Sequence, residues 1–432
     1  MNPLSLALGL ISLCYLIVTF LLWYLTPRSR LDRKAAVVVL GDLGHSPRMC
    51  FHALSIAKVG CPVDLIGYED SDLMDEIKEN ALIRVIGLPK PVRKTGQSYL
   101  SYALGRVWRE NVTLHRALKL SDPTVVMVQN PPSIPTLGVA RYFTLWSSPG
   151  CKLVIDWHNL GYSILAMSQK GWMVKLYRAY ETIFGRVAYL HLAVSVRLGM
   201  ALKSNLGINP KRIIPLYDRP TKQRLVKDKA LSRAKFPEYD ADAAWVVTST
   251  SYTPDEDIRM LIKALEKYTE GPRIECIITG KGPMKAEIEQ EIRDSKFPNA
   301  KIHTSWLSYE DYHTLLGVSD LGISLHKSSS GWDLPMKVVD MFGAGLPVLA
   351  LDYSALKELV KPSNGLTFTD MASLIEGLKV LQDAWKLSDL KKGAIAESQN
   401  LWEQQWNLKV GPIFGYGQYT GEESSSDSSG DE

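Results

Sequence analysis

The sequence predicts an α/β protein with two doubly wound, Rossmann-like domains, preceded by one N-terminal transmembrane helix. Three observations carry this prediction: an uncharged run near the start, and two separate series of short β-branched runs that alternate with helical patterns. Runs that are apolar throughout are typical of parallel strands buried on both faces. With 432 residues and 46% hydrophobic content, the chain is long enough for two to three domains.

The uncharged run covers 4–25 and meets the roughly 20 residues that a helix needs to cross a bilayer. The first bases, Arg28 and Arg30, follow the run, so it is typical of a signal-anchor and not of a cleaved signal peptide. Lys and Arg residues that flank a membrane-spanning helix usually stay on the cytosolic side. We therefore expect residues 1–27 to be a single-pass anchor with a lumenal N-terminus, and the rest of the chain to lie in the cytosol.

The first α/β domain is expected over 35–217, and a polar, basic linker over 218–242. The strands expected in this domain are 36–40, 63–68, 124–129, 152–157 and 191–195.

The second α/β domain is expected over 243–388, so that the two domains face a cleft. A helical pattern over 389–420 is expected to return to the first domain, and the Ser-rich acidic tail over 421–432 to be disordered. The strands expected in the second domain are 244–250, 273–279, 301–307, 321–326 and 347–352.

The formal net charge is +4, and the acids of the tail mask a larger excess of bases in the rest of the chain. This excess suits an anionic membrane surface or phosphate ligands, and not nucleic acid, because no single basic run stands out. None of the five cysteines lies in a CxxC or zinc-ligand spacing. The cysteine pattern therefore predicts a protein of a reducing compartment. We expect it to bind no metal ion and no cofactor.

A glycine loop with the spacing GxxG, from Gly41 to Gly44, ends the first predicted strand and is followed by His45. Ser46 is the expected N-cap and Pro47 the first helical residue. Such a loop suits a phosphate or a sugar hydroxyl, although a plain strand-to-helix turn explains it equally well. The spacing is not GxGxxG, which disfavours a dinucleotide-dependent oxidoreductase.

The second domain opens with a hydroxyl-rich loop around Ser251, which could bind a diphosphate. Thr253 and Glu256 predict a capping box, so the acids at 255–257 are interpreted as the first helical turn and not as a metal-binding DxD. Lys281 and Gly282 follow a buried-strand pattern at a sheet edge where ligands bind. A phosphate-binding lysine and a simple turn lysine both remain open.

The segment 326–352 contains His326, a small polar loop with Ser330 and Gly331, and a helix with Lys337 and Asp340 one turn apart. The carboxylate could accept both ribose hydroxyls while the lysine meets phosphate. The alternative is a surface ion pair, which would contribute about 0.2 to 0.5 kcal/mol.

These motifs make a family resemblance visible. The pattern formed by Pro335, Lys337, Asp340, Gly345 and Pro347 resembles the nucleotide-sugar motif of GT-B glycosyltransferases. From about Val37 to Asp370, the chain resembles the chitobiosyldiphosphodolichol β-mannosyltransferase family. The further segments that carry the resemblance are 129–137 (QNPPSIPTL), 156–162 (DWHNLGY), 250–257 (TSYTPDED) and 331–348 (GWDLPMKVVDMFGAGLPV).

The resemblance implies the GT-B fold, GDP-mannose as donor, GlcNAc₂-diphosphodolichol as acceptor, and the first mannosylation of N-glycan assembly at the endoplasmic reticulum membrane. Other mannosyltransferases of lipid-linked oligosaccharide assembly are candidate partners. Retaining GT-B enzymes place a glutamate two turns ahead of the ribose acid, where this chain has Trp332 and Asp333. That departure fits the inverting β-1,4 transfer that the family implies.

Inversion needs a general base for the acceptor hydroxyl and cations or dipoles for the departing GDP. His158 is the leading candidate base because an imidazole titrates near neutral pH, and Asp156 and Asp42 are its rivals. The expected donor-binding residues are Ser251, Lys281, Gly282, His326, Ser330, Gly331, Lys337 and Asp340. The expected acceptor-binding residues are Gly41, Gly44, His45, Gln129 and Asn130.

The segment from Tyr99 to Leu120 mixes apolar and basic residues at helical spacing, as an interfacial helix would, although core packing explains most such apolar residues. Two other functions stay open. One is a catalytically silent, membrane-bound scaffold that binds a nucleotide sugar, because a protein can keep its fold after it has lost catalytic activity. The other is a GT-B transferase that uses a UDP-sugar.

Overall fold

The computed structural model describes residues 33–93, 95–168, 171–254, 256–328 and 330–416. The expected anchor at 1–27 and the expected acidic tail at 421–432 lie outside these residues. Among the residues described, no helix combines the length and the apolar character needed to cross a bilayer. Contacts divide the chain into two compact units, Met1–Asp156 with Ile183–Leu190, and Trp157–Thr182 with His191–Glu432.

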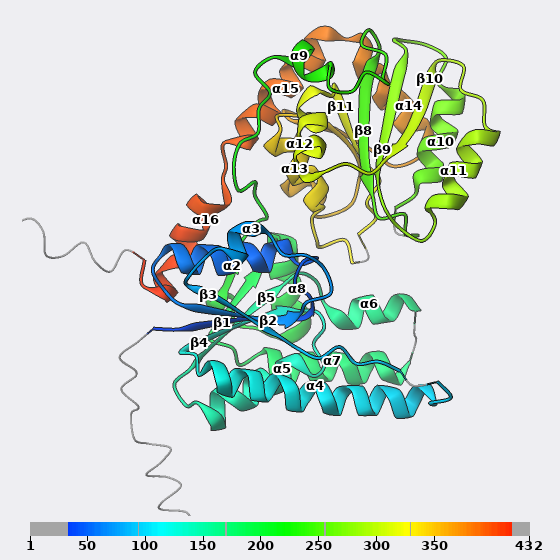
Figure 1. Ribbon diagram of the computed structural model, residues 1–432. Coiled ribbons are helices and arrows are strands. Elements are labelled where there is room, and N and C mark those ends of the chain that lie inside the picture. The colour runs from blue at the N-terminus through cyan, green and yellow to red at the C-terminus, as the bar shows by residue number, and fades with distance from the viewer. Residues whose placement is uncertain (1–32, 94, 169–170, 255, 329, 417–432) are drawn as a thin grey trace, which may run out of the picture. The chain divides into compact units, whose positions relative to one another are not determined.

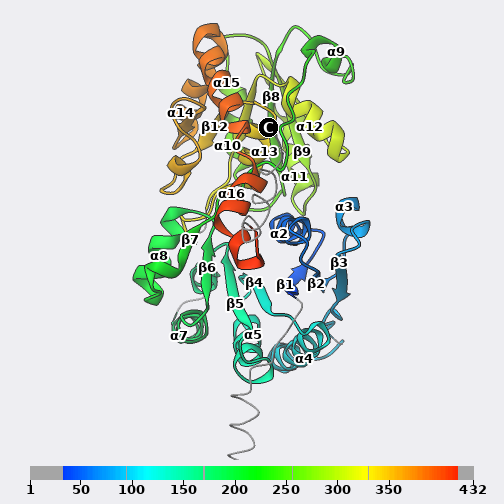
Figure 2. The ribbon, with the colours of Figure 1, turned by 90° about the vertical axis from the view of Figure 1, so that its left-hand side faces the viewer.

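The first sheet has seven strands in the order β3-β2-β1-β4-β5-β6-β7 (Figures 1 and 2). The pairs β1–β2, β2–β3, β1–β4 and β6–β7 are parallel. Its strands are β1 (Ala35–Asp42), β2 (Val63–Tyr68), β3 (Ile83–Gly87), β4 (Val125–Asn130), β5 (Lys152–Trp157), β6 (Leu190–Ala193) and β7 (Ile213–Pro215).

Helix α2 covers one face of this sheet, and α4 and α5 lie on the other (Figure 1). The helices in this half of the sequence are α2 (Pro47–Lys58), α3 (Asp75–Lys78), α4 (Tyr99–Ser121), α5 (Thr136–Tyr142), the π-helical turn η1 (Phe143–Ser147), α6 (Gly161–Ser168), α7 (Trp172–Gly185), α8 (Val196–Leu206) and the 3₁₀ turn η2 (Pro210–Arg212).

The second sheet has six strands in the order β10-β9-β8-β11-β12-β13, and all five neighbouring pairs are parallel. Its strands are β8 (Ala244–Thr250), β9 (Ile274–Gly280), β10 (Ala300–Ser305), β11 (Leu321–Ser324), β12 (Val348–Leu351) and β13 (Gly365–Phe368).

Two apolar cores pack on the two faces of this sheet, one beneath α12 and α13 and the other beneath α10, α11 and α14 (Figure 1). The helices of this part are α9 (Lys229–Arg233), α10 (Ile258–Lys267), α11 (Lys285–Asp294), α12 (Tyr309–Val318), α13 (Met336–Gly343), η3 (Leu356–Glu358), α14 (Met371–Leu378), η4 (Lys379–Gln382), α15 (Ala384–Ser398), α16 (Trp402–Lys409) and η5 (Gly411–Phe414).

Both sheets therefore have Rossmann-like topology, as the sequence predicted. In such sheets, ligands bind beyond the carboxyl ends of the strands where the strand order reverses. In the first sheet this point lies between β1 and β4, and in the second between β8 and β11. The carboxyl ends of these four strands and the loops that follow them contain ten of the sixteen site residues expected from the sequence.

The three strands that the sequence analysis missed, β3, β7 and β13, all lie at edges of the sheets. Residues of β3 are only partly buried, and β7 is three residues long and partly exposed throughout. An edge strand buries fewer neighbours than a central one, so it lacks the continuous apolar run that marked the others.

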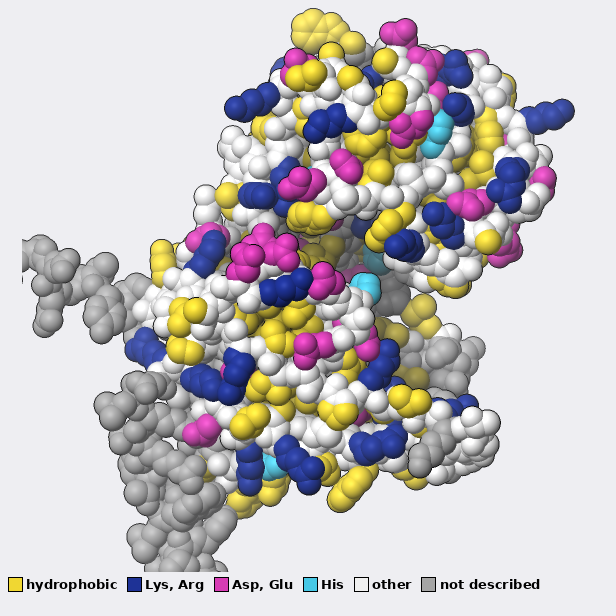
Figure 3. All heavy atoms as spheres, viewed as in Figure 1, with side chains coloured by type: hydrophobic (Ala, Val, Ile, Leu, Met, Phe, Trp, Pro, Cys, Tyr) yellow, Lys and Arg dark blue, Asp and Glu magenta, His cyan; other side chains and the backbone are white. Residues whose placement is uncertain are grey.

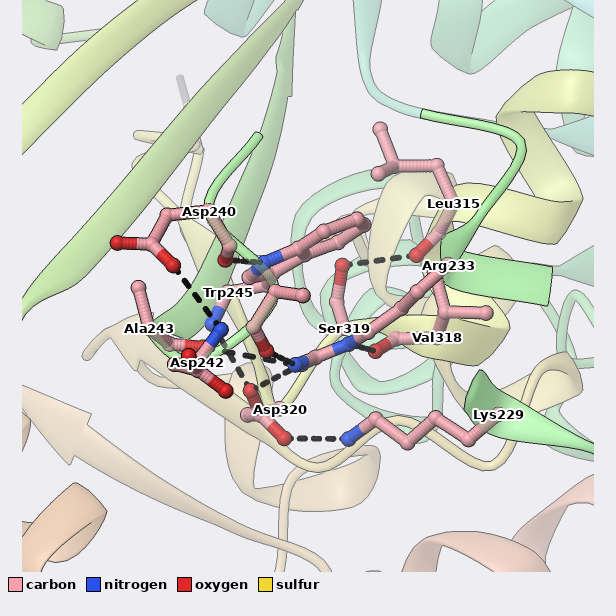
Figure 4. Close-up of polar contacts among 11 residues, drawn as sticks. Lys229, Arg233, Asp240, Asp242, Ala243, Trp245, Leu315, Val318, Ser319 and Asp320 are labelled. Atoms are coloured by element: carbon pink, nitrogen blue, oxygen red, sulfur yellow. Dashed lines mark hydrogen bonds and ion pairs between the residues drawn. The ribbon is translucent and has the colours of Figure 1, made fainter. Parts of the chain in front are cut away.

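The expected linker at 218–242 is only partly an extended connection. It contains α9, and Phe236 and Tyr239 are buried in the core beside Trp245. Lys229 and Arg233 both point to Asp320, whose carboxylate also accepts from the Trp245 backbone N–H at 2.8 Å (Figure 4). The carbonyl of Asp240 accepts from Trp245 Nε1 at 2.8 Å. Basic composition here reflects ion pairs with the second sheet.

The predicted start of the helix after β8 was wrong. Helix α10 begins at Ile258, and its N-cap is Asp257, whose side chain accepts from the Met260 backbone N–H. Glu256 lies before the helix, is buried, and forms an isolated antiparallel bridge with His326. The expected capping box of Thr253 and Glu256 is therefore absent, because the Glu256 carboxylate has other partners.

Candidate functional site

The loop after β1 is built around the Asp42 carboxylate. Its Oδ1 accepts from the backbone N–H groups of Gly44, Asp70 and Ser71 at 3.1–3.3 Å, and its Oδ2 lies 2.5 Å from His45 Nδ1. Burial alone would raise the pKa of Asp42, but the hydrogen bonds from Ser71 and His45 lower it to about 2. A carboxylate this acidic is a weak proton acceptor near neutral pH.

Two features of this loop refine the sequence-based interpretation. Helix α2 does begin at Pro47 after Ser46, but the Ser46 hydroxyl donates to the Asp42 carbonyl at 2.9 Å and does not cap the helix. A Cβ on Gly44 would lie 2.7 Å from the carbonyl oxygen of Asp72, so this glycine permits a close approach of two loops. Gly41 has room for a side chain.

Asp156, at the end of β5, is fully buried in an ion pair with Arg48 of α2. Two guanidinium nitrogens donate to its two oxygens at 2.7 and 2.9 Å, and His52 Nε2 lies 3.3 Å from Oδ2. Both lone-pair edges of the carboxylate thus face groups of helix α2. This ion pair connects the sheet to helix α2. It disfavours Asp156 as the general base that would take the proton from the acceptor hydroxyl.

The residues that follow β4 and β5 lie at the expected edge of the sheet. His158 is half-buried just beyond β5, and the preceding Trp157 is fixed by a 3.1 Å hydrogen bond from its Nε1 to His191 Nδ1. Burial lowers the pKa of His191 to about 3, so this histidine is a neutral acceptor. Asn130 is buried, and Gln129 donates to the Pro131 carbonyl at 3.3 Å.

In the second sheet, a buried carboxylate organises the loop after β8. Glu256 Oε2 accepts from Thr250 Oγ1 and from the Ser251 backbone N–H, both at 2.7 Å, and Oε1 pairs with Lys337 Nζ of α13. The sequence analysis did not identify this role of Glu256, because its partners are far from it in the chain. Lys337 therefore lies at the switch point between β8 and β11, where an anionic ligand would compete with Glu256 for its ammonium group.

The glycines after β9 bring a second loop against this one. A Cβ on Gly280 would lie 1.8 Å from the Thr250 carbonyl oxygen, and a Cβ on Gly282 would lie 1.7 Å from that of Ser251. Only glycine allows such an approach of two backbones. Lys281 Nζ lies 4.1 Å from the centre of the Trp306 ring, which follows β10.

The loop after β11 is fixed by Asp333. Its carboxylate binds His326 Nε2 at 2.9 Å and accepts from the Ser328 hydroxyl, which itself accepts from the Gly331 backbone N–H at 2.7 Å. Burial raises the Asp333 pKa, but the hydrogen bonds from His326 and Ser328 outweigh it and hold the pKa below its usual value. Ser330 accepts from the Trp332 backbone N–H.

Asp340 does not share partners with Lys337. Burial raises its pKa to about 7, against the opposing effect of Arg224 and with a smaller contribution from Asp218. Among the described contacts of α13, Lys337 pairs with Glu256, and no ion pair joins it to Asp340. The alternative interpretation as a surface ion pair between these two residues was therefore wrong.

Among the described residues, no group of three or more His, Cys, Asp or Glu side chains is arranged to hold a metal ion. Asp257 of the 255–257 acids is a helix cap, as described above.

Comparison with known proteins agrees with this architecture. Residues 232–393 match the family described as glycosyl transferases group 1. The chain is 40% identical to the chitobiosyldiphosphodolichol beta-mannosyltransferase of Yarrowia lipolytica, covering 94% of this chain and 93% of that protein. It is 36% identical to the human protein of the same name, covering 94% and 98%.

Solved structures show the same fold at low identity. A sucrose-phosphate synthase from Thermosynechococcus elongatus aligns with a TM-score of 0.71 at 14% identity, over 89% of this chain and 98% of that one. A glycosyltransferase from Rickettsia africae aligns with a TM-score of 0.65 at 14% identity, over the same shares. With its two Rossmann-like sheets and these relatives, the chain belongs to the chitobiosyldiphosphodolichol β-mannosyltransferase family of GT-B glycosyltransferases.

Proposed function

We propose that this enzyme moves mannose from GDP-mannose to GlcNAc₂-diphosphodolichol, with inversion to a β-1,4 linkage. The observation that carries the proposal is the Lys337 ammonium at the switch point of the second sheet, beside the Ser251 backbone N–H and the loop of His326. A cation and hydrogen-bond donors at such a point suit the diphosphate of a nucleotide sugar. The names of the family members supply the sugar and the lipid.

The second sheet is proposed as the donor side. The diphosphate would draw Lys337 away from Glu256, and Lys281 and the His326–Gly331 loop would contribute further donors. Asp340 would accept the ribose hydroxyls as a carboxylate. Because burial raises its pKa to about 7, this contact should strengthen as the pH rises through neutrality.

The first sheet is proposed as the acceptor side, with the Gly41–His45 loop, Gln129 and Asn130 around the chitobiose. His158 is the proposed base. The acidity of Asp42 and the ion pair of Asp156 support this choice, because neither carboxylate is well suited to accept a proton near pH 7. The stabilisation of departing GDP is assigned to Lys337, Lys281 and backbone N–H groups, without a metal ion.

We further propose that the chain is a single-pass protein of the endoplasmic reticulum membrane, with residues 1–27 as the anchor and the two α/β domains in the cytosol. The dolichol acceptor supports this location, since its lipid remains in the bilayer. Other mannosyltransferases of lipid-linked oligosaccharide assembly are the proposed partners.

Release of GDP tests the proposal against its two rivals. The full-length chain in detergent micelles should release GDP from GDP-mannose only when lipid-linked chitobiose is added. Excess unlabelled GDP should block the reaction far better than UDP. Binding of GDP-mannose without acceptor-dependent release would identify a silent scaffold, and stronger inhibition by UDP would identify a UDP-sugar transferase.

A further inference from the structure

Helix α4 exposes an unusual set of apolar side chains. Leu104 is 65% exposed, Trp108 72% and Leu120 67%, although a soluble helix normally turns such residues toward the core. The core-facing residues of the helix are different ones, among them Leu114 and Leu118, which are fully buried. Core packing therefore does not explain the three exposed apolar residues.

The same exposed face is basic. Arg109, Arg116 and Lys119 are exposed on it, whereas the sole acid of the helix, Glu110, is buried and pairs with Tyr68 and Arg106. Neither the Arg109 nor the Arg116 guanidinium forms a hydrogen bond or ion pair with any described residue. Figure 3 shows basic and apolar side chains side by side along the lower edge of the view, where Figure 1 places α4.

A groove runs along this face. The segment after β3 and the outer side of α4 enclose a cavity of about 620 Å³, whose charged lining is Lys90, Arg93, Arg109 and Arg116 together with Glu110. Trp108 and Val92 line it as well, and Val92 is 71% exposed. The cations surround a space large enough for a phosphate headgroup, and the two apolar side chains lie beside it.

The face continues onto the neighbouring turn. Tyr142 packs its ring against His115 of α4, with centroids 5.5 Å apart, and is itself 55% exposed. Trp146, in the π-helical turn η1 that follows Tyr142, is 46% exposed. Tryptophan and tyrosine favour the boundary between water and lipid, where one part of the ring is wet and the other apolar.

We propose that the α4 face, defined by Leu104, Trp108, Arg109, Arg116, Tyr142 and the groove beside them, docks on a bilayer and holds the phosphate of an anionic lipid headgroup. Charge complementarity selects this occupant: the face offers unpaired guanidinium groups beside aromatic and aliphatic side chains, which is the composition that binds anionic lipid surfaces. The proposal does not depend on the sugar donor or on catalysis.

The test places one environment-sensitive fluorescent amino acid at position 108 of the full-length chain, reconstituted in vesicles that contain brominated lipids. The matched control carries the same label at Trp385 of α15, which is 83% exposed. In vesicles of equal parts phosphatidylcholine and phosphatidylserine, we expect strong quenching at position 108 and little at position 385. In phosphatidylcholine alone, quenching at position 108 should be weaker.

Charge reversal supplies the second arm. Each base near an anionic bilayer contributes about fivefold to partitioning, so R109E with R116E should shift the ratio of inserted to free label by at least about tenfold. K263E with K386E, two exposed bases on α10 and α15, changes the net charge equally and should have little effect. The proposal fails if position 108 stays as unquenched as position 385, or if R109E with R116E changes nothing. It also fails if the label is shielded from aqueous iodide but not quenched by lipid, since protein would then cover the face.

Discussion

The carboxyl edges of the two sheets both carry aspartates, but these aspartates differ in protonation. Asp42 of the first sheet accepts several hydrogen bonds and has a pKa of about 2, and Asp156 is locked to Arg48. Asp340 of the second region is partly buried without such donors, and burial raises its pKa to about 7. Surroundings and not residue type therefore decide which carboxylate can change charge near neutral pH.

The comparison extends to the cations. Arg48 is 2% exposed and belongs to the framework of the first sheet, whereas Lys337 is 28% exposed at its side chain and remains within reach of a ligand. At the first edge, the Asp42 and Asp156 carboxylates already have partners within the protein. The second edge contains charges that a bound diphosphate could rearrange.

The largest effect is expected for the base of the first edge. His158→Ala should lower turnover by about 10²- to 10⁴-fold while donor affinity persists, because a base acts mainly in the transition state. Asp42→Asn is the matched comparison and should lower turnover much less. Steady-state rates over a range of pH measure this. A normal His158→Ala beside an inactive Asp42→Asn would transfer the role to the carboxylate.

Removal of the buried Arg48 guanidinium should mainly affect stability. Arg48→Ala leaves the Asp156 charge buried and unpaired, so we expect a loss of about 3 to 5 kcal/mol in the free energy of unfolding. Lys337→Ala is the comparison for the second edge: its loss should be smaller, because water can reach that pair, but its affinity for GDP should fall. Denaturant unfolding and calorimetric titration separate the two. Equal losses in the free energy of unfolding for Arg48→Ala and Lys337→Ala would contradict this difference between the two edges.

Asp340→Ala should weaken GDP-mannose binding by about 1.5 to 3 kcal/mol, the value of a hydrogen bond to a charged group. The Michaelis constant for the acceptor should change little. Titration of the donor against wild type and variant measures the effect. An unchanged donor affinity with a lower melting temperature would make Asp340 a structural residue only.

The raised pKa of Asp340 also predicts a pH dependence of stability. Between pH 4 and pH 7, the folded state holds a proton that the unfolded state releases, so the contribution of this group to stability falls as the pH rises through that range. Asp340→Asn abolishes the ionisation. Its melting temperature relative to wild type should be nearly unchanged near pH 4 and higher by about 2 to 4 °C above pH 7. A constant difference across this range would contradict the assigned pKa.

The smallest effect is expected for metal removal. EDTA should leave transfer unchanged, because the leaving diphosphate is assigned to Lys337, Lys281 and backbone N–H groups. The measurement is the transfer rate before and after chelation, then after Mg²⁺ or Mn²⁺ is added. Loss of activity on chelation that either metal restores would overturn this assignment.

The central strands could be predicted from sequence because their apolar runs are continuous: β2, β5 and β8 begin and end at the expected residues. The edge strands and the start of α10 could not, since edge strands are only partly buried and the residues that bind Glu256 are distant in the chain. For the candidate site, the sequence predicted which loops lie at the sheet edges. It could not show that Arg48 neutralises Asp156 or that Lys337 faces Glu256, because these contacts depend on tertiary packing.

The proposed transfer of mannose to lipid-linked chitobiose can be tested by identifying the glycan that the enzyme makes. The full-length enzyme is incubated with radiolabelled GDP-mannose and GlcNAc₂-diphosphodolichol, and the glycan is then released from the lipid by mild acid. We expect one labelled trisaccharide that β-mannosidase cleaves and α-mannosidase does not. A labelled product that only α-mannosidase cleaves, or no product while GDP-mannose remains bound, would contradict it.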